Sequence, residues 1–287
     1  MNKLAMNGKI CLVTGANAGI GKETCMALAS KGAEVVMSAR NFEQAEEVRK
    51  FVISQTGNSN IHLMIADLSD PQEVATLSDK FQAKFQKLDV LINNAAIFLT
   101  DYIETPEGIE TQWMVNYLAP YLLTRRLMNC LMAAPEARII NVSSNAHLRG
   151  SINFADLNRA SNYQGFKAYA QSKLGNILFT KSLSVRLAGT AISSYAVHPG
   201  VVSTGIGNKY SHGWLAWLWR LGKPFMISPA RGAATIVYLA AAPQIQDLSG
   251  LYFVNCRPHT SSPQSTDPEI AKRLWEVSES MIQPYLE

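Results

Sequence analysis

Tyr169 and Lys173 stand four residues apart in the segment Ala168-Tyr-Ala-Gln-Ser-Lys-Leu174, and this pair is well suited to acid–base chemistry. On a helix, that spacing puts both side chains on one face, with a rise of about 6 Å between them. An ammonium held near a phenol favours the phenolate and so lowers the phenol pKa. A tyrosine tuned in this way can pass a proton to or from a substrate oxygen. Helices also produce this spacing by chance, so the assignment depends on the residues that accompany the pair.

A glycine-rich turn supplies the first accompanying feature. The sequence Thr14-Gly-Ala-Asn-Ala-Gly-Ile-Gly21 follows an apolar strand pattern and leads directly into a helical one. Glycine lets the backbone turn sharply and approach a phosphate, and the helix that follows presents N–H groups and a positive dipole end to it. We therefore predict a dinucleotide site here, with a tight turn that holds no ligand as the alternative. Its candidate residues are Gly15, Asn17, Gly19, Ile20 and Gly21.

The end of the second strand pattern bears on which dinucleotide is bound. It reads Met37-Ser-Ala-Arg40, without the acidic residue that would bind the ribose 2′-hydroxyl of NAD. Arg40 instead offers a forked cation suited to a 2′-phosphate. NADP(H) is therefore predicted over NAD(H), and a merely solvated arginine is the alternative.

Two further strand ends fit the same groove, because ligands of doubly wound sheets bind at the carboxyl ends of the strands. Asp67, followed by Leu68, is predicted to accept a hydrogen bond from the adenine amino group. Asp67 also suits a helix N-cap. Asn93 and Ala95 follow the fourth strand pattern, where small residues would let the backbone lie under a ribose.

The elements that must position these residues alternate along the whole chain. Strand patterns cover Ile10–Thr14, Glu34–Ser38, Ile61–Ala66, Val90–Asn93, Arg138–Val142, Ser194–His198 and Leu251–Val254. Helical patterns cover Gly21–Lys31, Phe42–Gln55, Pro71–Phe85, Thr111–Ala133, Phe166–Leu187 and Pro229–Ala241. Such alternation predicts an α/β fold: a single-domain, Rossmann-type, doubly wound parallel sheet of about seven strands with helices on both faces. No repeat or linker divides residues 1–287.

Composition narrows the class of protein. With 26 basic and 22 acidic residues among 287, the net charge of +4 is slight and dispersed, which argues against a nucleic-acid partner. The four cysteines are widely spaced and are expected to be reduced, as in a cytoplasmic protein. No apolar run approaches the length of a transmembrane helix. No histidine shows metal-ligand spacing, and neither His147 nor His198 is assigned a catalytic role.

Together these ordered motifs resemble the short-chain dehydrogenase/reductase family, and most of all its branch of retinol dehydrogenases and carbonyl reductases. The resemblance runs from about Gly8 to the final helix. The matching positions are Thr14–Gly21, Asn93–Ala96 with Ala96 in place of the usual glycine, Asn116, Ser144, Tyr169 with Lys173, and His198–Thr204.

The resemblance implies a role for each matched position. Tyr169 would be the general acid in reduction and the general base in oxidation, and Ser144 would orient the substrate oxygen. Lys173 would bind the nicotinamide ribose and lower the Tyr169 pKa. Asn116 would hold a water through its main-chain carbonyl. The segment that contacts nicotinamide would contribute Pro199, Gly200, Val202 and Thr204.

Pro120 gives an independent reason to expect the role of Asn116. It lies four residues after Asn116 in a helical pattern, and proline has no N–H to give to the Asn116 carbonyl. That carbonyl is therefore predicted to lose its helical partner and to accept from water. In the alternative, Pro120 ends one helix and begins another.

The segment at residues 203–227 is predicted to be a substrate lid. Trp214, Trp217, Leu218 and Leu221 share one helical face there. An apolar lid implies a lipophilic substrate. Packing onto the domain and peripheral contact with a membrane surface are the alternatives. By analogy with the family, a homodimer or homotetramer is expected through the helices that carry Asn116 and Tyr169.

The leading hypothesis is an NADP(H)-dependent oxidoreductase that interconverts a carbonyl and an alcohol on a lipophilic, retinal-like molecule, an aldehyde or a ketone. Reduction of a C=C or C=N bond on the same scaffold is a second hypothesis. A non-catalytic NADP(H)-sensing protein is a third, but the intact set of Ser144, Tyr169 and Lys173 argues against it.

Overall fold

The computed structural model describes residues 6–202 and 227–286. One eight-stranded sheet runs through them in the order β3-β2-β1-β4-β5-β6-β7-β8. Its strands are β1 (Ile10–Thr14), β2 (Glu34–Ala39), β3 (Ile61–Ile65), β4 (Val90–Asn93), β5 (Ala137–Val142), β6 (Ile192–His198), β7 (Tyr252–Val254) and β8 (Arg257–His259). Strands β1 to β7 are parallel, which confirms the predicted doubly wound sheet. The strand order reverses between β1 and β4: β2 and β3 lie on one side of β1, and the later strands lie on the other. Ligands of doubly wound sheets bind at this reversal.

Strand β8 pairs antiparallel with β7 and was not predicted. The two strands join through Asn255 and Cys256, which both have positive φ, 49° and 59°. Two positive φ angles are the signature of the tightest hairpin turn, which usually carries glycine at its second position. Because cysteine stands there instead, the usual Asn-Gly signal for this turn is missing from the sequence.

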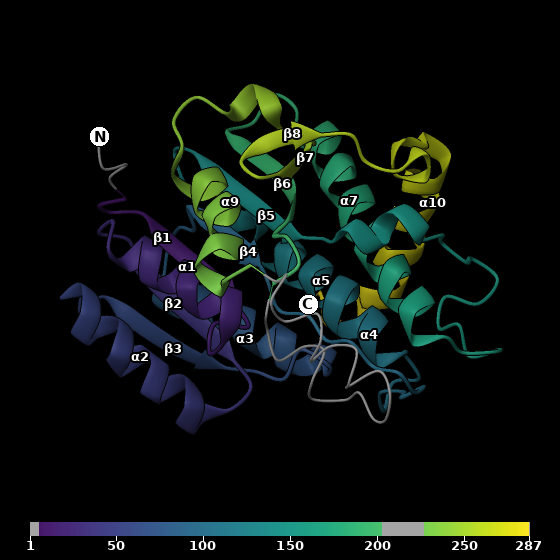
Figure 1. Ribbon diagram of the computed structural model, residues 1–287, viewed down its shortest axis with the longest axis horizontal. Coiled ribbons are helices and arrows are strands. Elements are labelled where there is room, and N and C mark those ends of the chain that lie inside the picture. The colour runs from purple at the N-terminus through teal and green to yellow at the C-terminus, as the bar shows by residue number, and fades with distance from the viewer. Residues whose placement is uncertain (1–5, 203–226, 287) are drawn as a thin grey trace.

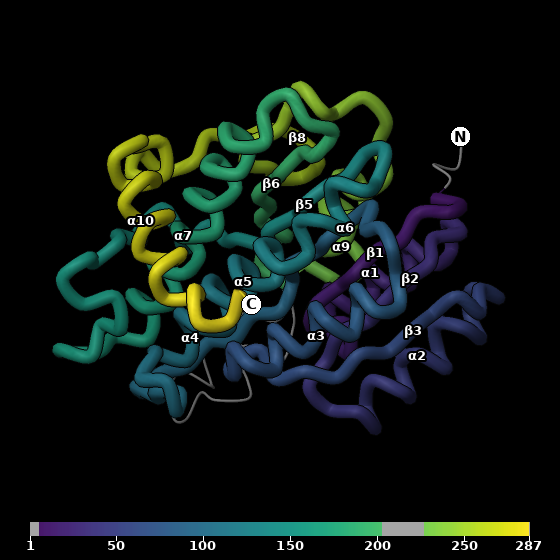
Figure 2. The backbone as a smooth tube through the Cα atoms, turned by 180° about the vertical axis from the view of Figure 1, so that it is seen from behind, coloured from purple at the N-terminus to yellow at the C-terminus, as the bar shows by residue number. Residues whose placement is uncertain are grey.

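The helices cover both faces of the sheet. They are α1 (Gly19–Ala29), α2 (Phe42–Thr56), α3 (Pro71–Lys84), α4 (Thr111–Trp113), η1 (Met114–Leu118), α5 (Ala119–Arg126), α6 (Met128–Met132), η2 (Asn145–Arg149), α7 (Gly165–Arg186), α9 (Pro229–Ala241), η4 (Gln246–Leu248), η5 (Pro263–Thr266), α10 (Pro268–Ile282) and η6 (Gln283–Tyr285). In Figure 1, α1, α2 and α9 lie on the near side of the sheet. Figure 2, seen from behind, shows α3, α5 and α10 on the other.

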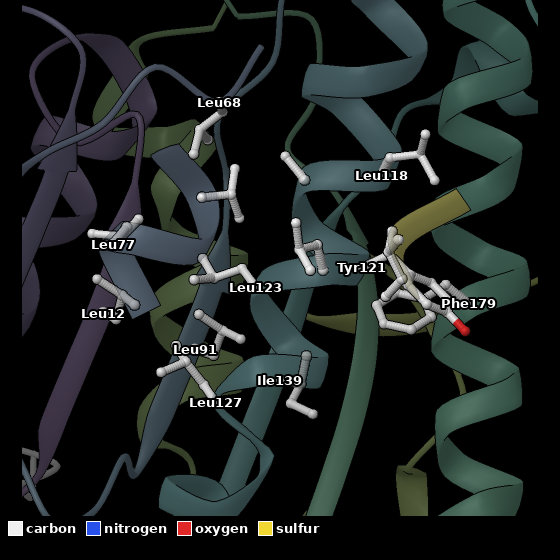
Figure 3. Close-up of a cluster of buried hydrophobic side chains, with 14 of the residues drawn as sticks. Leu12, Leu68, Leu77, Leu91, Leu118, Tyr121, Leu123, Leu127, Ile139 and Phe179 are labelled. Atoms are coloured by element: carbon white, nitrogen blue, oxygen red, sulfur yellow. The ribbon is translucent and has the colours of Figure 1, made fainter. Parts of the chain in front are cut away.

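Neighbouring side chains of each strand enter different cores. Leu12 joins the cluster under α3, α5 and α7, whereas Cys11 and Val13 join the cluster under α1 and α9. Parallel strands covered on both faces read as continuous apolar runs for this reason. Figure 3 shows part of the first cluster, with Tyr121 of α5 and Phe179 of α7 meeting at one end.

The predicted helix Thr111–Ala133 is not continuous. It divides into α4, the wide-turned π-helix η1, α5 and α6. Pro120 cannot donate a helical hydrogen bond, and the Ala119 N–H just before it bonds five residues back, to the Met114 carbonyl. Short π-helical turns of this kind are common at functional sites.

Helix α10 packs on the outer side of α5 and α7. Its Leu274 and Ile282 are buried in the first core cluster. The Tyr121 hydroxyl donates to Glu279 Oε1 at 2.6 Å, and the Tyr117 hydroxyl pairs with Ser278 Oγ at 2.8 Å. The helix start has an Asp267 cap followed by proline, a signal that the sequence does carry. Among the described residues, no helix is both long and apolar enough to cross a membrane.

Candidate active site

The glycine turn is built so tightly that side chains are excluded from it. Gly15 has a φ of 63°, and a Cβ there would lie 2.9 Å from Ala95 Cα. A Cβ on Gly21 would lie 2.1 Å from the Gly15 carbonyl oxygen. Asn94 Nδ2 donates to the Thr14 carbonyl oxygen at 2.8 Å and so ties the turn to the loop after β4. The two strand ends therefore form one rigid cradle beside the switch in strand order.

The turn leads into an open helix end. Helix α1 begins at Gly19, and neither a side-chain cap nor an acidic residue is present in its first turn. Its first N–H groups are therefore suited to an anion such as a pyrophosphate. Ile20 lies beside Gly232 of α9, and Val202 approaches the same glycine. The structure thus brings the glycine turn next to the segment that was predicted to contact nicotinamide.

The predicted adenosine end gathers at the ends of β2 and β3. Arg40 is 62% exposed, and its Nη1 lies 3.6 Å from Asp67 Oδ2. Asn17 Nδ2 donates to Gln44 Oε1 at 2.8 Å on the neighbouring helix α2. Leu68 is buried in the core, so it offers a ligand only its main chain. These placements are compatible with the predicted binding roles.

Asp67 is not a helix cap. Its Oδ1 accepts from Ser69 N at 2.9 Å and from Ser69 Oγ at 2.7 Å, whereas Asp70 caps α3. The capping alternative for Asp67 was therefore wrong, because the helix begins three residues later. The second carboxylate oxygen faces Arg40.

Asn93 turns its side chain into the protein interior. It is 2% exposed, and its Nδ2 donates to Asn141 Oδ1 at 2.8 Å and to Thr124 Oγ1 at 3.2 Å. Any contact of Asn93 with a ribose must come from its main chain. The neighbouring Asn94, which was not a candidate, holds the glycine turn with its side chain.

Ser144, Tyr169 and Lys173 come together at the ends of β5 and α7. The Ser144 hydroxyl is hydrogen-bonded to Tyr169. Lys173 Nζ lies 5.5 Å from the Tyr169 ring centre and donates to the Val142 carbonyl oxygen at 3.0 Å. Ser143, the other serine of the pair, donates to the Lys173 carbonyl oxygen at 2.6 Å and is buried. The second serine is therefore the one that faces the phenol.

Burial dominates the pKa values of this pair. Burial raises the pKa of Tyr169 to about 12, against a smaller lowering by the Ser144 hydrogen bond. Burial also lowers the pKa of Lys173 to about 7. In the polypeptide alone, burial therefore decides the phenol pKa, and the lowering of that pKa by Lys173 stays a prediction. Removal from water disfavours the charged form of each group.

Asn116 has a partner that the sequence analysis missed. Its side chain is fixed by Ile97, whose N–H donates to Oδ1 at 2.7 Å and whose carbonyl accepts from Nδ2 at 3.0 Å. Its main-chain carbonyl accepts from Asn176 Nδ2 at 2.9 Å. The carbonyl that Pro120 deprives of a helical donor thus receives a side-chain amide. Asn176 lies one turn after Lys173 on α7, but its partner Asn116 is 60 residues away in the sequence.

His147 is buried beneath the turn at Ser143 and Ser144, here called the serine turn, and supports it. It is fully buried, and its Nδ1 contacts the Ser144 carbonyl oxygen at 2.6 Å while Nε2 accepts from Ser262 N at 3.1 Å. These partners place the ring proton on Nδ1, and burial lowers its pKa. Burial likewise lowers the pKa of His198 to about 4. Both rings are neutral near pH 7.

The segment after β6 lies beside Ile20 of α1 and Gly232 of α9. Pro199 and Gly200 follow the strand, Gly200 with a φ of 94°. Val202 pairs with Ile227 across an isolated bridge. Thr204 and the predicted lid with Trp214 to Trp219 lie outside the described residues.

Comparison with known proteins gives concordant matches. A family model described as short chain dehydrogenase matches residues 9–213. The chain is 42% identical over 272 residues to retinol dehydrogenase 12 of Mus musculus, which covers 94% of this chain and 85% of that protein. It is 37% identical over 286 residues to retinol dehydrogenase 13 of Homo sapiens, covering 98% and 86%. A solved structure of an uncharacterised protein from Mycobacterium paratuberculosis matches with a TM-score of 0.78 and 31% identity, covering 97% of this chain and 95% of that one.

Proposed function

Since this chain belongs to the short-chain dehydrogenase family, we propose that it uses NADP(H) to interconvert a carbonyl and an alcohol on a lipophilic small molecule. The family assignment makes it an oxidoreductase of CH–OH groups that resembles the retinol dehydrogenases. The cofactor preference and the substrate class are the parts that we propose. A retinal-like molecule, an aldehyde or a ketone would fit.

The observation that carries the proposal is the meeting of Ser144, Tyr169 and Lys173 beside the glycine cradle. The cradle fits a dinucleotide, because added Cβ atoms at Gly15 and Gly21 would collide with its backbone and α1 begins without a cap. Gly15, Gly19 and Gly21 would hold the pyrophosphate. When bound, the dinucleotide supplies or accepts a hydride.

The side chains of this chain then handle the proton. Ser144 Oγ–H donates to the substrate oxygen and orients it. In reduction, the Tyr169 hydroxyl gives its proton to that oxygen, and in oxidation the phenolate takes it back. The Lys173 amine, with a pKa of about 7, is protonated in part of the molecules at neutral pH and can restore the proton.

The preference for NADP(H) is supported by Arg40. Its guanidinium is exposed at the end of β2, where a 2′-phosphate would lie, and no acidic residue occupies that strand end. Asp67 lies 3.6 Å away and would help to orient the guanidinium. A forked cation of this kind suits a phosphate dianion better than a ribose hydroxyl.

The lipophilic substrate is supported by apolar side chains on the elements that carry the site. Phe98 meets the Tyr169 ring edge to face, with the ring centres 5.6 Å apart. Leu148 and Phe166 are 58% and 45% exposed. Leu148 follows Ser144 in η2, and Phe166 lies one turn before Tyr169 on the same face of α7. Exposed apolar side chains on the elements that carry Ser144 and Tyr169 favour an apolar ligand.

The test is a spectrophotometric assay of NADPH oxidation with retinal, aliphatic aldehydes, ketones and enones. Turnover is expected with lipophilic carbonyl compounds. Reaction of the enones alone would instead favour reduction of a C=C bond. Cofactor binding without turnover of any compound would favour the sensing alternative.

Tyr169→Phe is the matching variant. Loss of one hydroxyl should reduce kcat by at least about a hundredfold, because it removes the proton donor. NADPH affinity, measured by fluorescence, should stay within about threefold, since the ring and Lys173 remain. Undiminished turnover by this variant would remove Tyr169 from the mechanism.

A further inference from the structure

Asn176 shares an acceptor with the Lys173 amine. It is 2% exposed on α7, and its Nδ2 donates to the Asn116 carbonyl at 2.9 Å and to the Val142 carbonyl at 3.3 Å. Lys173 Nζ donates to the same Val142 carbonyl at 3.0 Å. The Asn176 amide thus links η1 to the end of β5, at the same carbonyl that the Lys173 amine uses.

The orientation of this amide follows from its neighbours. A flipped Asn176 would place Oδ1 against two carbonyl oxygens, so Nδ2 must face them. Oδ1 then points elsewhere, and it is buried with no hydrogen-bond partner among the described residues. An unpaired buried acceptor costs free energy. Packing alone would therefore favour an apolar side chain at position 176. We attribute the presence of asparagine to the hydrogen bonds that Nδ2 donates.

Both carbonyls that Asn176 reaches lie where regular structure fails. Pro120 removes the N–H that would bond the Asn116 carbonyl in an α-helix. Val142 is the last residue of β5, and the chain turns there toward Ser144. Asn176 supplies a donor to each, and it does so from the helix that carries Tyr169 and Lys173.

We propose that Asn176 is a positioning residue: by holding the Asn116 and Val142 carbonyls, it fixes the acceptor that keeps the Lys173 amine next to Tyr169. This inference rests on the proposed function for the role of Lys173. Asn176 itself contacts neither the phenol nor the serine that would meet a substrate. It acts through the Val142 carbonyl.

The test compares Asn176→Leu and Asn176→Asp with Thr180→Val in the full-length protein. Leucine keeps the volume and removes the donors. Thr180 is a matched control, because it is fully buried one turn further along α7 and bonds Asn141 and the Asn176 carbonyl without reaching Val142. The first measurement is the pH titration of Lys173 by NMR of ¹³Cε-labelled lysine, with Lys173→Met to assign the signal.

Asn176→Leu should raise the titration midpoint of Lys173 by about one pH unit, because the Val142 carbonyl oxygen beside the amine loses its amide donor and favours the ammonium. It should also lower kcat about tenfold with KM within about threefold, as a misplaced proton donor would. Thr180→Val should change neither. An Asn176→Leu midpoint and kcat equal to those of the control would overturn the proposal.

Asn176→Asp keeps the proposal testable if the leucine variant does not fold. A carboxyl at this position donates only while protonated, so kcat should fall with rising pH along a limb that the wild type lacks. A pH profile parallel to that of the wild type would contradict the proposal. Absence of turnover in the wild type would refute the proposed function only, since the Lys173 titration still decides the role of Asn176.

Discussion

At the scale of single residues, burial acts on Tyr169 and Lys173 in the same sense: it disfavours charge on both. The phenol therefore stays protonated and ready to donate, and the amine is close to its midpoint near pH 7. Under the proposed function, a proton donor held neutral beside a half-charged amine would serve reduction at neutral pH. The spacing of Tyr169 and Lys173 is visible in the sequence, but their pKa values depend on how deeply the fold buries them.

The buried amine makes stability depend on pH. Lys173 has a pKa of about 7 in the folded protein against an ordinary value of 10.5, so between these values the unfolded chain binds the additional proton. The cost of burying this group is therefore greatest below pH 7, and it is relieved as pH rises through that window, so stability rises with pH there. Lys173→Met should flatten the dependence by up to about 1.4 kcal/mol per pH unit from pH 7 to 10. Urea denaturation of both proteins across this range is the measurement, and parallel curves would contradict it.

Arg40 gives a prediction for the cofactor. Arg40→Ala should weaken NADPH binding about tenfold at low salt, because a charge-assisted hydrogen bond to phosphate is lost. NADH binding should change less than about twofold. Arg49→Ala is a suitable control, since Arg49 pairs with Glu46 on α2. Fluorescence titration measures both affinities, and an unchanged NADPH affinity would refute the assignment.

At the scale of elements, the sequence predicted best those helices and strands whose conformation follows from their own residues. The predicted strands lie within two residues of the observed ones, because parallel strands buried on both faces are continuously apolar. The segment Thr111–Ala133 was predicted as one helix, with a division at Pro120 only as the alternative, and the structure shows that division because α5 begins at Ala119. Asn176 was missed since its partners, Asn116 and Val142, are distant in sequence.

The glycine turn can be tested with a matched pair of substitutions. Gly15 and Gly57 have similar φ angles, 63° and 69°, but only Gly15 faces a close neighbour, Ala95. Both alanine variants should lose about 1–2 kcal/mol of stability to the left-handed backbone. Only Gly15→Ala should also lower cofactor affinity, by at least about tenfold, because its Cβ displaces the cradle. Equal affinities in the two variants would show that the turn does not bind the cofactor.

At the scale of the whole molecule, α10 determines which surfaces are available. It covers the outer sides of α5 and α7, the helices through which the sequence analysis expected a homodimer or homotetramer to form. While α10 is docked, a second copy would have to use another surface. The expected assembly stays a prediction, and light scattering over a range of concentrations would measure it.

The attachment of α10 can be measured directly. Leu274 is 1% exposed within the core cluster shared with α5 and α7. Leu274→Ala should reduce the free energy of unfolding by about 2–5 kcal/mol, through lost burial and the cavity left behind. The exposed neighbour Lys272 provides the control, and Lys272→Ala should stay within about 0.5 kcal/mol. A similar loss in both variants would mean that α10 contributes little to the core.

The link between Ser262 and His147 has a consequence for biosynthesis. The backbone of Ser262 holds the ring that in turn holds the Ser144 carbonyl, so the turn at Ser144 depends on a stretch that comes 115 residues after His147. During synthesis the N-terminal part emerges and begins to fold first. The glycine cradle can therefore form on the ribosome well before the serine turn is secured, and a nascent or prematurely terminated polypeptide would gain a nucleotide pocket before it gained a complete catalytic centre.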